Sequence, residues 1–294
     1  MVARQMSNPI VVIVGETASG KSALAMELAE RFNGEIITAD SRTVYKGMDI
    51  GTAKPSPEDR QHIRHHGLDL VEPSEQFTAA DFKAYADAAL IDISMRGKLP
   101  IIVGGTGLYV DAVLYDFQFN PLAAPAERAR LQKLSIQELQ AELREKSIAL
   151  PANERNPRHL IRAIETGGRT ADRGQLRPNT LILGLSPDRE ELSARIGQRV
   201  EHMIALGLEQ EVLGLSRQYG WEVPAMLTIG YREWKDYFNG LQTLPETERQ
   251  IIKNTMSYAK RQRTWFKRNN SVQWLANRGN LPTSVDLVTT LLNN

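Results

Sequence analysis

Residues 10–22 read IVVIVGETASGKS, a short β-branched apolar run that ends in the pattern G-x-x-x-x-G-K-[ST]. With a helical pattern behind it from Ala23 to Phe32, this segment predicts a strand, a glycine-rich loop and a helix of an α/β fold. The glycines let several backbone N–H groups point at one anion, and the helix N-terminus adds partial positive charge. Lys21 supplies a charge for terminal phosphates, and the Ser22 hydroxyl is placed to ligate Mg²⁺. We therefore predict that the loop binds a di- or triphosphate through Gly15, Thr17, Ala18, Ser19, Gly20, Lys21 and Ser22.

The composition is that of an ordinary globular chain of 294 residues, with 41% hydrophobic and 24% charged residues. The chain has no cysteine, which excludes disulfides, a thiolate zinc site and a cysteine nucleophile. Its longest uninterrupted apolar stretch, residues 10–14, is too short to span a bilayer and runs directly into the phosphate loop. We expect a cytoplasmic protein without a membrane segment.

The first third of the chain alternates between strand and helix patterns. Strands are expected at 10–15, 35–40 and 99–105, with helices at 21–32 and 78–96. Such alternation predicts a parallel sheet flanked by helices, in which ligands lie beyond the carboxyl ends of the strands. Three strand ends carry polar clusters, and we expect them to converge on one crevice: GETASGKS, DSRTVY and GGTGLY.

The pattern changes after Tyr115. Two short helices and then a helix through RNPRHLIRAIE are expected, before a strand at 180–186 and a helix from Pro187 to about Leu206. Ser135 and Glu138 form a capping-box sequence, and Arg158 and Arg162 lie one turn apart. We predict a core formed by residues 1–116 and 180–294, interrupted by a small helical insertion at 117–179.

Two polar residues stand at the carboxyl ends of predicted strands. Asp40 is placed either to hold Mg²⁺ through water or to accept a proton from a nucleophile; as a bland alternative, it caps a turn. Thr106, inside a glycine-rich loop, is placed to orient a small group or to cap the next helix. His65 and His66 lack the spacing of metal ligands, and we interpret them as structural or surface residues in a loop.

The segment 249–268 is strongly basic, with seven lysines and arginines and no acidic residue. Tyr258, Trp265 and Phe266 are interleaved with the basic residues. On a helix, the basic positions share a face that is either simply solvated or a contact surface for a nucleic-acid backbone.

Several motifs taken together resemble one family, the tRNA dimethylallyltransferases, over nearly the whole chain. Members of that family attach an isopentenyl group to an adenosine beside the anticodon. The resemblance implies a P-loop NTPase-like sheet with a helical insertion. It rests on GETASGKS (15–22), DSRTVYKGMDIGTAKP (40–55), FTAADF (77–82), GGTGLY (104–109), RHLIRAIE (158–165), IGYREW (229–234) and AKRQRTWF (259–266).

The resemblance also implies roles for individual residues. The phosphate loop would hold the diphosphate of dimethylallyl diphosphate, rather than ATP, with Mg²⁺ at Ser22. Asp40 would be the general base on the exocyclic amine of adenine, and Thr106 its companion at the reacting nucleotide. Contacts to the tRNA anticodon stem-loop are implied for Asp40, Ser41, Arg42, Thr43, Thr106, Arg128, Arg158, His159, Leu160, Ile161, Arg162, Lys260, Arg261 and Arg263.

Three positions depart from the family pattern without removing a residue assigned to the chemistry. Glu16 stands where the family usually has proline, and we expect its side chain to point outward. Thr43 replaces the more usual glutamine, and Leu227 replaces an arginine or glutamine that some members carry near the diphosphate.

Other functions remain open at the level of sequence. An ATP-dependent small-molecule kinase would use the same loop, and a sister isopentenyltransferase would modify free adenine nucleotides without tRNA. A non-enzymatic alternative is an RNA-binding nucleotide switch, which would not depend on Asp40. For the tRNA dimethylallyltransferase function we expect a monomer.

Overall fold

The structure, a computed structural model, describes residues 8–120, 123–276 and 280–293. The chain divides into two compact units, one formed by Met1–Leu114 with Leu176–Asn294 and the other by Tyr115–Gln175. The division falls within a few residues of the bounds expected from sequence, 117 and 179. Each unit is described below by itself.

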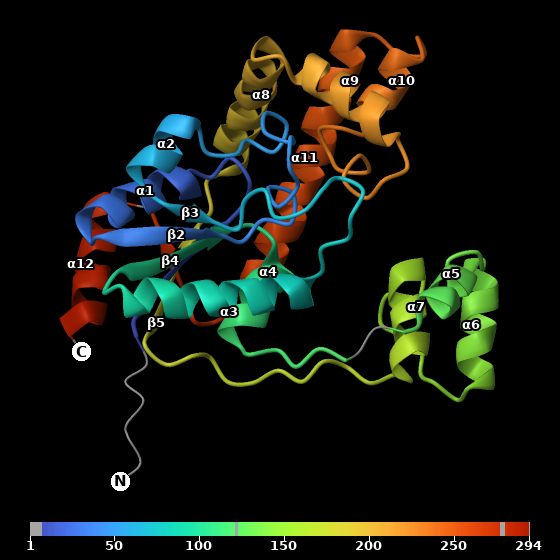
Figure 1. The fold of residues 1–294 in the computed structure, drawn as a ribbon, viewed down its shortest axis with the longest axis horizontal. Helices are drawn as coiled ribbons and strands as arrows, with labels where there is room; N and C mark the ends of the chain where they lie inside the picture. The colour runs from blue at the N-terminus through green and yellow to red at the C-terminus, as the bar shows by residue number, and fades with distance from the viewer. Residues whose placement is uncertain (1–7, 121–122, 277–279, 294) are drawn as a thin grey trace. The chain divides into compact units, whose positions relative to one another are not determined.

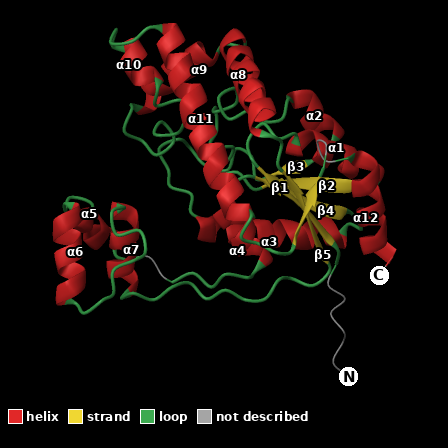
Figure 2. Ribbon diagram, turned by 180° about the vertical axis from the view of Figure 1, so that it is seen from behind, coloured by secondary structure: helices red, strands yellow, loops and turns green. Residues whose placement is uncertain are grey.

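A parallel sheet forms the centre of the larger unit (Figures 1 and 2). Within the described ranges it has the strand order β3-β2-β4-β1-β5-β6, and every neighbouring pair is parallel. The expected α/β parallel sheet is therefore confirmed. The strands are β1 (Ile10–Gly15), β2 (Gly34–Thr38), β3 (His65–His66), β4 (Leu99–Gly104), β5 (Thr180–Leu185) and β6 (Val272–Leu275).

The strand β1 lies between β4 and β5, and all of its residues are buried. Val11 lies in register with Ile101 of β4 and with Leu181 of β5. Both faces of β1 are covered, so the strand is a continuous β-branched run rather than an alternating one. This central position brings the loop after β1 to the middle of the carboxyl edge of the sheet.

Helices cover both faces of the sheet, as Figure 2 shows. On one face, Leu28 and Val288 pack against Ile36 and Ile101. On the other face, the stacked rings of Phe82 and Tyr109, 4.3 Å between centroids, join two further helices. The first pair of helices is α1 (Lys21–Arg31) and α12 (Leu281–Asn293); the second face is covered by α3 (Ala79–Met95), α4 (Gly107–Leu114) and α11 (Leu244–Phe266).

A second apolar cluster lies beyond the carboxyl edge of the sheet. Trp234 and Tyr231 are fully buried there against Met48 and Val212. This cluster fixes the long loop after β2 to the helices that follow β5. These helices are α8 (Arg189–Ala205), α9 (Leu208–Tyr219) and α10 (Trp234–Phe238); α2 (Pro57–His62) follows the loop itself.

The buried side chain of Lys54 holds the loop after β2 together. Its side chain is 1% exposed, and its ammonium group contacts Asp69 at 2.6 Å and Asp49 at 2.8 Å. It also donates to the backbone oxygen of Tyr45 at 2.6 Å. A buried lysine needs such partners, because a lone desolvated charge is costly. These contacts tie three parts of the loop to one buried ammonium group.

The smaller unit is a helical subdomain with its own core. Ser135 and Glu138 cap the second helix reciprocally, as the sequence predicts, and Gly167 ends the third in the left-handed region at φ 60°. The helices are α5 (Pro125–Leu131), α6 (Ile136–Glu145) and α7 (Pro157–Thr166), packed around Leu131, Leu139, Leu143, Leu160, Ile161 and Ile164.

Some elements differ from expectation. His65 and His66 form the short edge strand β3 rather than a loop, and His66 is buried with its Nε2 2.8 Å from a Glu35 carboxylate oxygen. Neither β6 nor α12 is expected from the sequence patterns. Among the described helices, none is both long and apolar enough to cross a membrane.

Candidate active site at the phosphate loop

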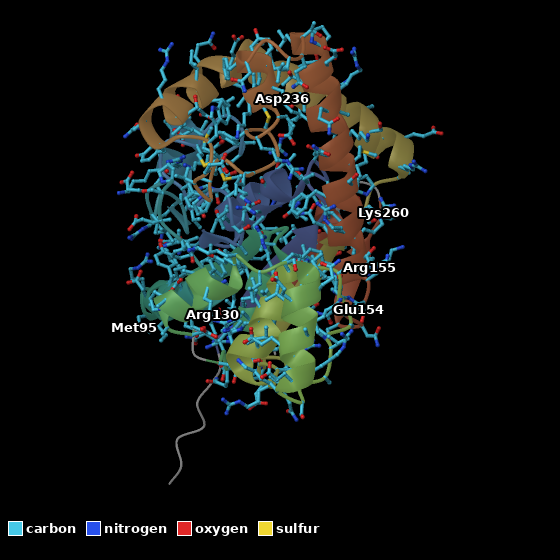
Figure 3. All side chains as sticks on the ribbon, turned by 90° about the vertical axis from the view of Figure 1, so that its right-hand side faces the viewer. Met95, Arg130, Glu154, Arg155, Asp236 and Lys260 are labelled. Atoms are coloured by element: carbon cyan, nitrogen blue, oxygen red, sulfur yellow. The ribbon has the colours of Figure 1, made fainter. Side chains whose placement is uncertain are left out.

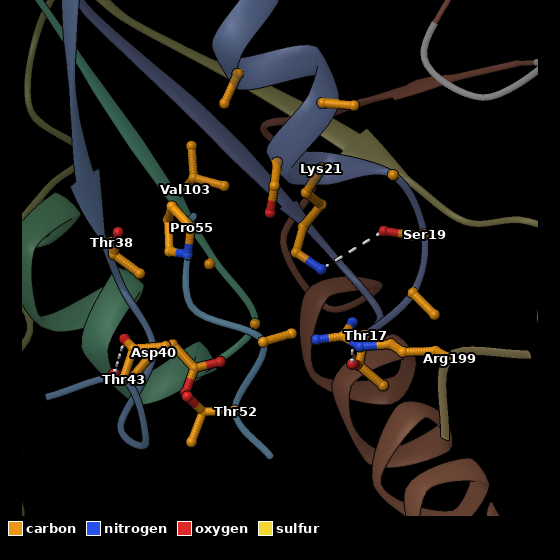
Figure 4. A pocket seen from close by; sticks show the side chains of 18 of the residues that line it. Thr17, Ser19, Lys21, Thr38, Asp40, Thr43, Thr52, Pro55, Val103 and Arg199 are labelled. Atoms are coloured by element: carbon orange, nitrogen blue, oxygen red, sulfur yellow. Dashed lines mark hydrogen bonds between the residues drawn. The ribbon is translucent and has the colours of Figure 1, made fainter. Parts of the chain in front are cut away.

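A cavity of about 560 Å³ opens at the carboxyl ends of β1, β2 and β4 (Figure 4). It lies wholly within the larger unit. The phosphate loop, the loop after β2 and the helix α8 form its walls. Residues that line it include Thr17, Ser19, Lys21, Ser22, Asp40, Thr43, Thr52, Arg195, Arg199 and Gln262.

The phosphate loop needs glycine at two positions for different reasons. Gly20 has φ 97°, which side chains rarely adopt, and it directly precedes α1. A Cβ on Gly15 would lie 2.2 Å from the carbonyl oxygen of Leu185. The loop curls tightly enough for Lys21 to donate to the backbone oxygen of Glu16 and to lie 3.5 Å from Ser19 Oγ.

Burial, together with the nearby positive charge of Arg199, lowers the pKa of Lys21 to about 8. Asp40 and Glu16 act in the opposite direction. A bound anion would replace the hydration that this ammonium group has lost, because opposite charge favours the protonated form. The lysine is therefore well placed to bind a phosphate group.

Two arginines of α8 complete the phosphate side of the cavity, and sequence reasoning missed both. Arg199 Nη1 lies 3.4 Å from Thr17 Oγ1, and Arg195 Nη1 lies 3.3 Å from the backbone oxygen of Ala18. Burial lowers the pKa of Arg199, while Asp40 opposes this effect. Their four-residue spacing on the helix after a sheet strand was the available signal.

Asp40 and Thr106 lie at the ends of neighbouring strands, as the sequence analysis expects. A carboxylate oxygen of Asp40 accepts the backbone N–H of Arg42 at 2.8 Å. The hydroxyl of Thr106 accepts the backbone N–H of Ser41 at 3.0 Å. These bonds hold the start of the loop after β2 and aim the Asp40 carboxylate at the cavity.

Tyr258 of α11 is a further group beside this pair. Burial, together with the negative charge of Asp40, raises the pKa of its phenol to about 12. Contacts with Thr106 and Gln262 act in the opposite direction. The phenol therefore stays protonated at neutral pH and can donate a hydrogen bond.

Glu16 does not point outward, and that expectation is wrong. Its side chain is 1% exposed and pairs with Arg263 of α11. Because α11 packs over the phosphate loop, the Glu16 side chain is buried against this helix and does not reach solvent. Arg263, assigned to tRNA by resemblance, has its guanidinium on Glu16 and on the backbone oxygen of Pro187.

The residues assigned to tRNA fall into distinct groups. Arg158 and His159 are exposed on α7, and Lys260 and Arg261 are exposed on α11, where Figure 3 labels Lys260. Leu160 is buried within the insertion, as is Ile161. Their side chains form the core that supports their exposed neighbours, and the assignment of these two residues to tRNA stays a prediction.

The side chains of three further residues assigned to tRNA contact other groups of the protein. Arg128 and Arg162 each lie 3.2 Å from the buried carboxylate of Glu165. Thr43 is 4% exposed, and its hydroxyl donates to the backbone oxygen of Asp40 at 3.3 Å. Leu227 is 48% exposed and is not among the residues that line the cavity.

The donors in the cavity fit a magnesium ion that is held mainly by phosphate oxygens. Ser22 and Asp40 both line the cavity, and each would offer an oxygen ligand. Among the described residues no group of three or more His, Cys, Asp or Glu could form a dedicated metal cage. Mg²⁺ is commonly bound by one or two protein oxygens together with substrate phosphates.

The fold and the cavity define an α/β protein of the P-loop NTPase-like class, with a glycine-rich loop and an aspartate in one cavity and a separate helical insertion. The chain matches the family described as IPP transferase over residues 43–269. It is 45% identical to the tRNA dimethylallyltransferase of Anoxybacillus flavithermus, covering 92% of this chain and 90% of that protein. For the tRNA dimethylallyltransferase of Geobacillus thermodenitrificans the identity is 42%, with the same coverage.

Solved structures of similar proteins share the fold. The full-length tRNA isopentenylpyrophosphate transferase of Bacillus halodurans superposes with a TM-score of 0.76 at 35% identity, covering 97% of each chain. A eukaryotic dimethylallyltransferase acting on tRNA gives a TM-score of 0.78 at 25% identity, covering 97% of this chain and 80% of that one. This chain belongs to the IPP transferase family, whose curated relatives are tRNA dimethylallyltransferases.

Proposed function

We propose that this protein transfers a dimethylallyl group from dimethylallyl diphosphate to the exocyclic amine of the adenosine that follows the anticodon in tRNA. The observation that carries the proposal is the meeting of the phosphate loop and Asp40 in one cavity of a chain of this family. One wall offers cations to a diphosphate, and the opposite wall offers a carboxylate to a base.

The phosphate side binds the leaving group. Lys21 and Arg199 line the cavity together with the residues of the phosphate loop. Preorganised cations and amides stabilise charge where it develops in the transition state. Ser22 would hold Mg²⁺, which when bound neutralises the charge that grows on departing diphosphate.

Asp40 acts on the other side as general base. The amine nitrogen forms a bond to the allylic carbon, the carbon–oxygen bond to diphosphate breaks, and the amine proton passes to the Asp40 carboxylate. A carboxylate in this role contributes typically 10²–10⁴-fold in rate. Thr106 supports it by holding the N–H of Ser41 at 3.0 Å.

The RNA reaches this cavity through contacts to its backbone. Lys260 and Arg261 on α11, with Arg158 and His159 on α7, offer exposed side chains for phosphate groups. The target adenosine must leave its stack to meet Asp40, at a cost of a few kcal/mol that these contacts offset. We further infer that the protein acts as a monomer in the cytoplasm.

The test is transfer of a radiolabelled dimethylallyl group to unmodified anticodon stem-loops, with Mg²⁺ present and without ATP. Label should enter RNA that carries adenosine after the anticodon, and Asp40→Ala should remove turnover while the melting temperature stays close to that of the wild type. Asp286→Ala, an exposed aspartate of α12, is the control.

Other outcomes would select a different function. Label on free AMP or ATP, with none on RNA, would indicate a nucleotide-modifying isopentenyltransferase. ATP turnover without any transfer would favour a small-molecule kinase. Full output from Asp40→Ala would favour a non-enzymatic nucleotide switch.

A further inference from the structure

A buried carboxylate lies at the base of the phosphate loop. Glu16 directly follows Gly15, its side chain is 1% exposed, and its backbone oxygen accepts from Lys21. Negative charge at this position opposes the binding of an anion, and a buried carboxylate without a partner is costly. An acidic residue in this loop therefore needs a compensating cation.

Arg263 supplies that cation from a segment 247 residues away in sequence. Its Nε and Nη2 each donate to a different carboxylate oxygen of Glu16, the second at 2.9 Å. Nη2 also donates to the backbone oxygen of Pro187 at 2.8 Å, just before α8. One guanidinium thus joins the phosphate loop, α11 and the segment that leads to Arg195 and Arg199.

The neighbouring residue Gln262 holds the same loop through its backbone. Gln262 Oε1 accepts the N–H of Thr17 at 2.8 Å, and Nε2 donates to the carbonyl oxygen of Gly105 at 2.9 Å. A Cβ on Gly105 would lie 2.0 Å from that amide nitrogen, so this contact needs glycine. Two consecutive residues of α11 therefore fix two consecutive residues of the phosphate loop.

We propose that Arg263 is a positioning residue of the diphosphate site, which neutralises Glu16 and holds the phosphate loop against α11. The inference deepens the proposed function and rests on it for the identity of the ligand. It replaces an RNA contact as the role of Arg263. Glu16 and Arg263 act as a matched pair: the acidic residue is tolerated beside the diphosphate only while the arginine neutralises it.

The experiment measures binding of inorganic diphosphate with Mg²⁺ to the full chain by calorimetry. The variants are Arg263→Leu, and Arg263→Leu combined with Glu16→Gln. Arg263→Gln serves the same comparison if the leucine variant does not fold. Arg96→Leu is a matched control, because Arg96 also pairs with a buried glutamate, Glu35. The side chain of Arg96 is 32% exposed and that of Glu35 is 2% exposed, compared with 30% for Arg263 and 1% for Glu16.

Arg263→Leu should weaken diphosphate binding about tenfold, because it leaves the Glu16 charge uncompensated. Adding Glu16→Gln should restore most of the affinity. Arg96→Leu should lower the melting temperature and leave diphosphate affinity unchanged. Unchanged diphosphate affinity in Arg263→Leu, or a double variant that binds no better than the single one, would overturn the proposal.

Steady-state transfer separates the two roles of Arg263. If Arg263 positions the phosphate loop, Arg263→Leu should raise the KM for dimethylallyl diphosphate and leave the KM for the RNA unchanged. If Arg263 contacts the RNA, Arg263→Leu should raise the KM for the RNA and leave the KM for dimethylallyl diphosphate unchanged. That result would also overturn the proposal. If the wild type transfers nothing to RNA while the binding results hold, the proposed function fails and the positioning role stands.

Discussion

The hydroxyl oxygen of Thr106 accepts the backbone N–H of Ser41 at 3.0 Å, so the loop after β4 holds the residue that directly follows Asp40. A second bond, from the N–H of Thr106 to the backbone oxygen of Ala39 at 3.3 Å, lies on the other side of Asp40. The proposed base is thus braced from the neighbouring strand on both sides.

Thr106→Val keeps the shape of the side chain and removes the acceptor for Ser41. We expect kcat for transfer to fall about tenfold with little change in diphosphate binding, because the carboxylate loses its support. Thr106→Ser should restore most of the rate. The control is Thr264→Val on the exposed side of α11, and equal kcat for Thr106→Val and the wild type would contradict the bracing role.

Arg199→Leu removes a buried guanidinium. Burial disfavours the charged form of this group, which is why burial lowers the pKa of Arg199. We expect diphosphate affinity to fall by about tenfold or more, while the melting temperature stays level or rises. Arg189→Leu, at the exposed start of α8, should change neither quantity. A loss of stability without a loss of affinity would mean that Arg199 is structural.

Arg158 and Leu160 should respond differently to truncation. Arg158→Ala removes an exposed cation, so RNA affinity should fall and the slope of log affinity against log salt should decrease by about one. Leu160→Ala opens a cavity in the insertion core and should lower its stability by about 2–5 kcal/mol. Salt titrations of RNA binding and thermal melts check both, and diphosphate binding should persist in each variant.

Glu35 makes the free energy of unfolding depend on pH in the acidic range. Its hydrogen bond with Arg96 lowers its pKa to about 2 against burial, with His66 and Lys98 acting in the same direction as Arg96. The folded-state pKa lies below the ordinary value of 4.5, so this stabilisation is complete above pH 4.5 and is lost as pH falls toward 2.

The size of that contribution is roughly 3 kcal/mol. Denaturant titrations between pH 6 and about pH 3 should show the decline. Glu35→Gln should have lower stability at neutral pH and a flatter dependence on pH in that range. An unchanged acid profile in this variant would show that Glu35 contributes nothing.

The elements of the phosphate site could be predicted from sequence because their signals are local. The buried run of β1, the glycines at 15 and 20 and the start of α1 lie within one short segment. The nearness of Asp40 and Thr106 followed from a general rule, that parallel strands end at the same edge of a sheet. The exposed pair Arg158 and His159 could be placed on a helix from its periodicity.

Contacts between distant segments could not be predicted in this way. Glu16 was expected in solvent, and it is buried because α11 brings Arg263 to it across 247 positions of the chain. The short β3 and β6 have too few residues to show a period, and their pairing with β2 and β5 defines them. Local patterns reflect backbone preferences and the burial of one face. Which charges share a buried site depends on packing between elements, and only the tertiary structure decides that.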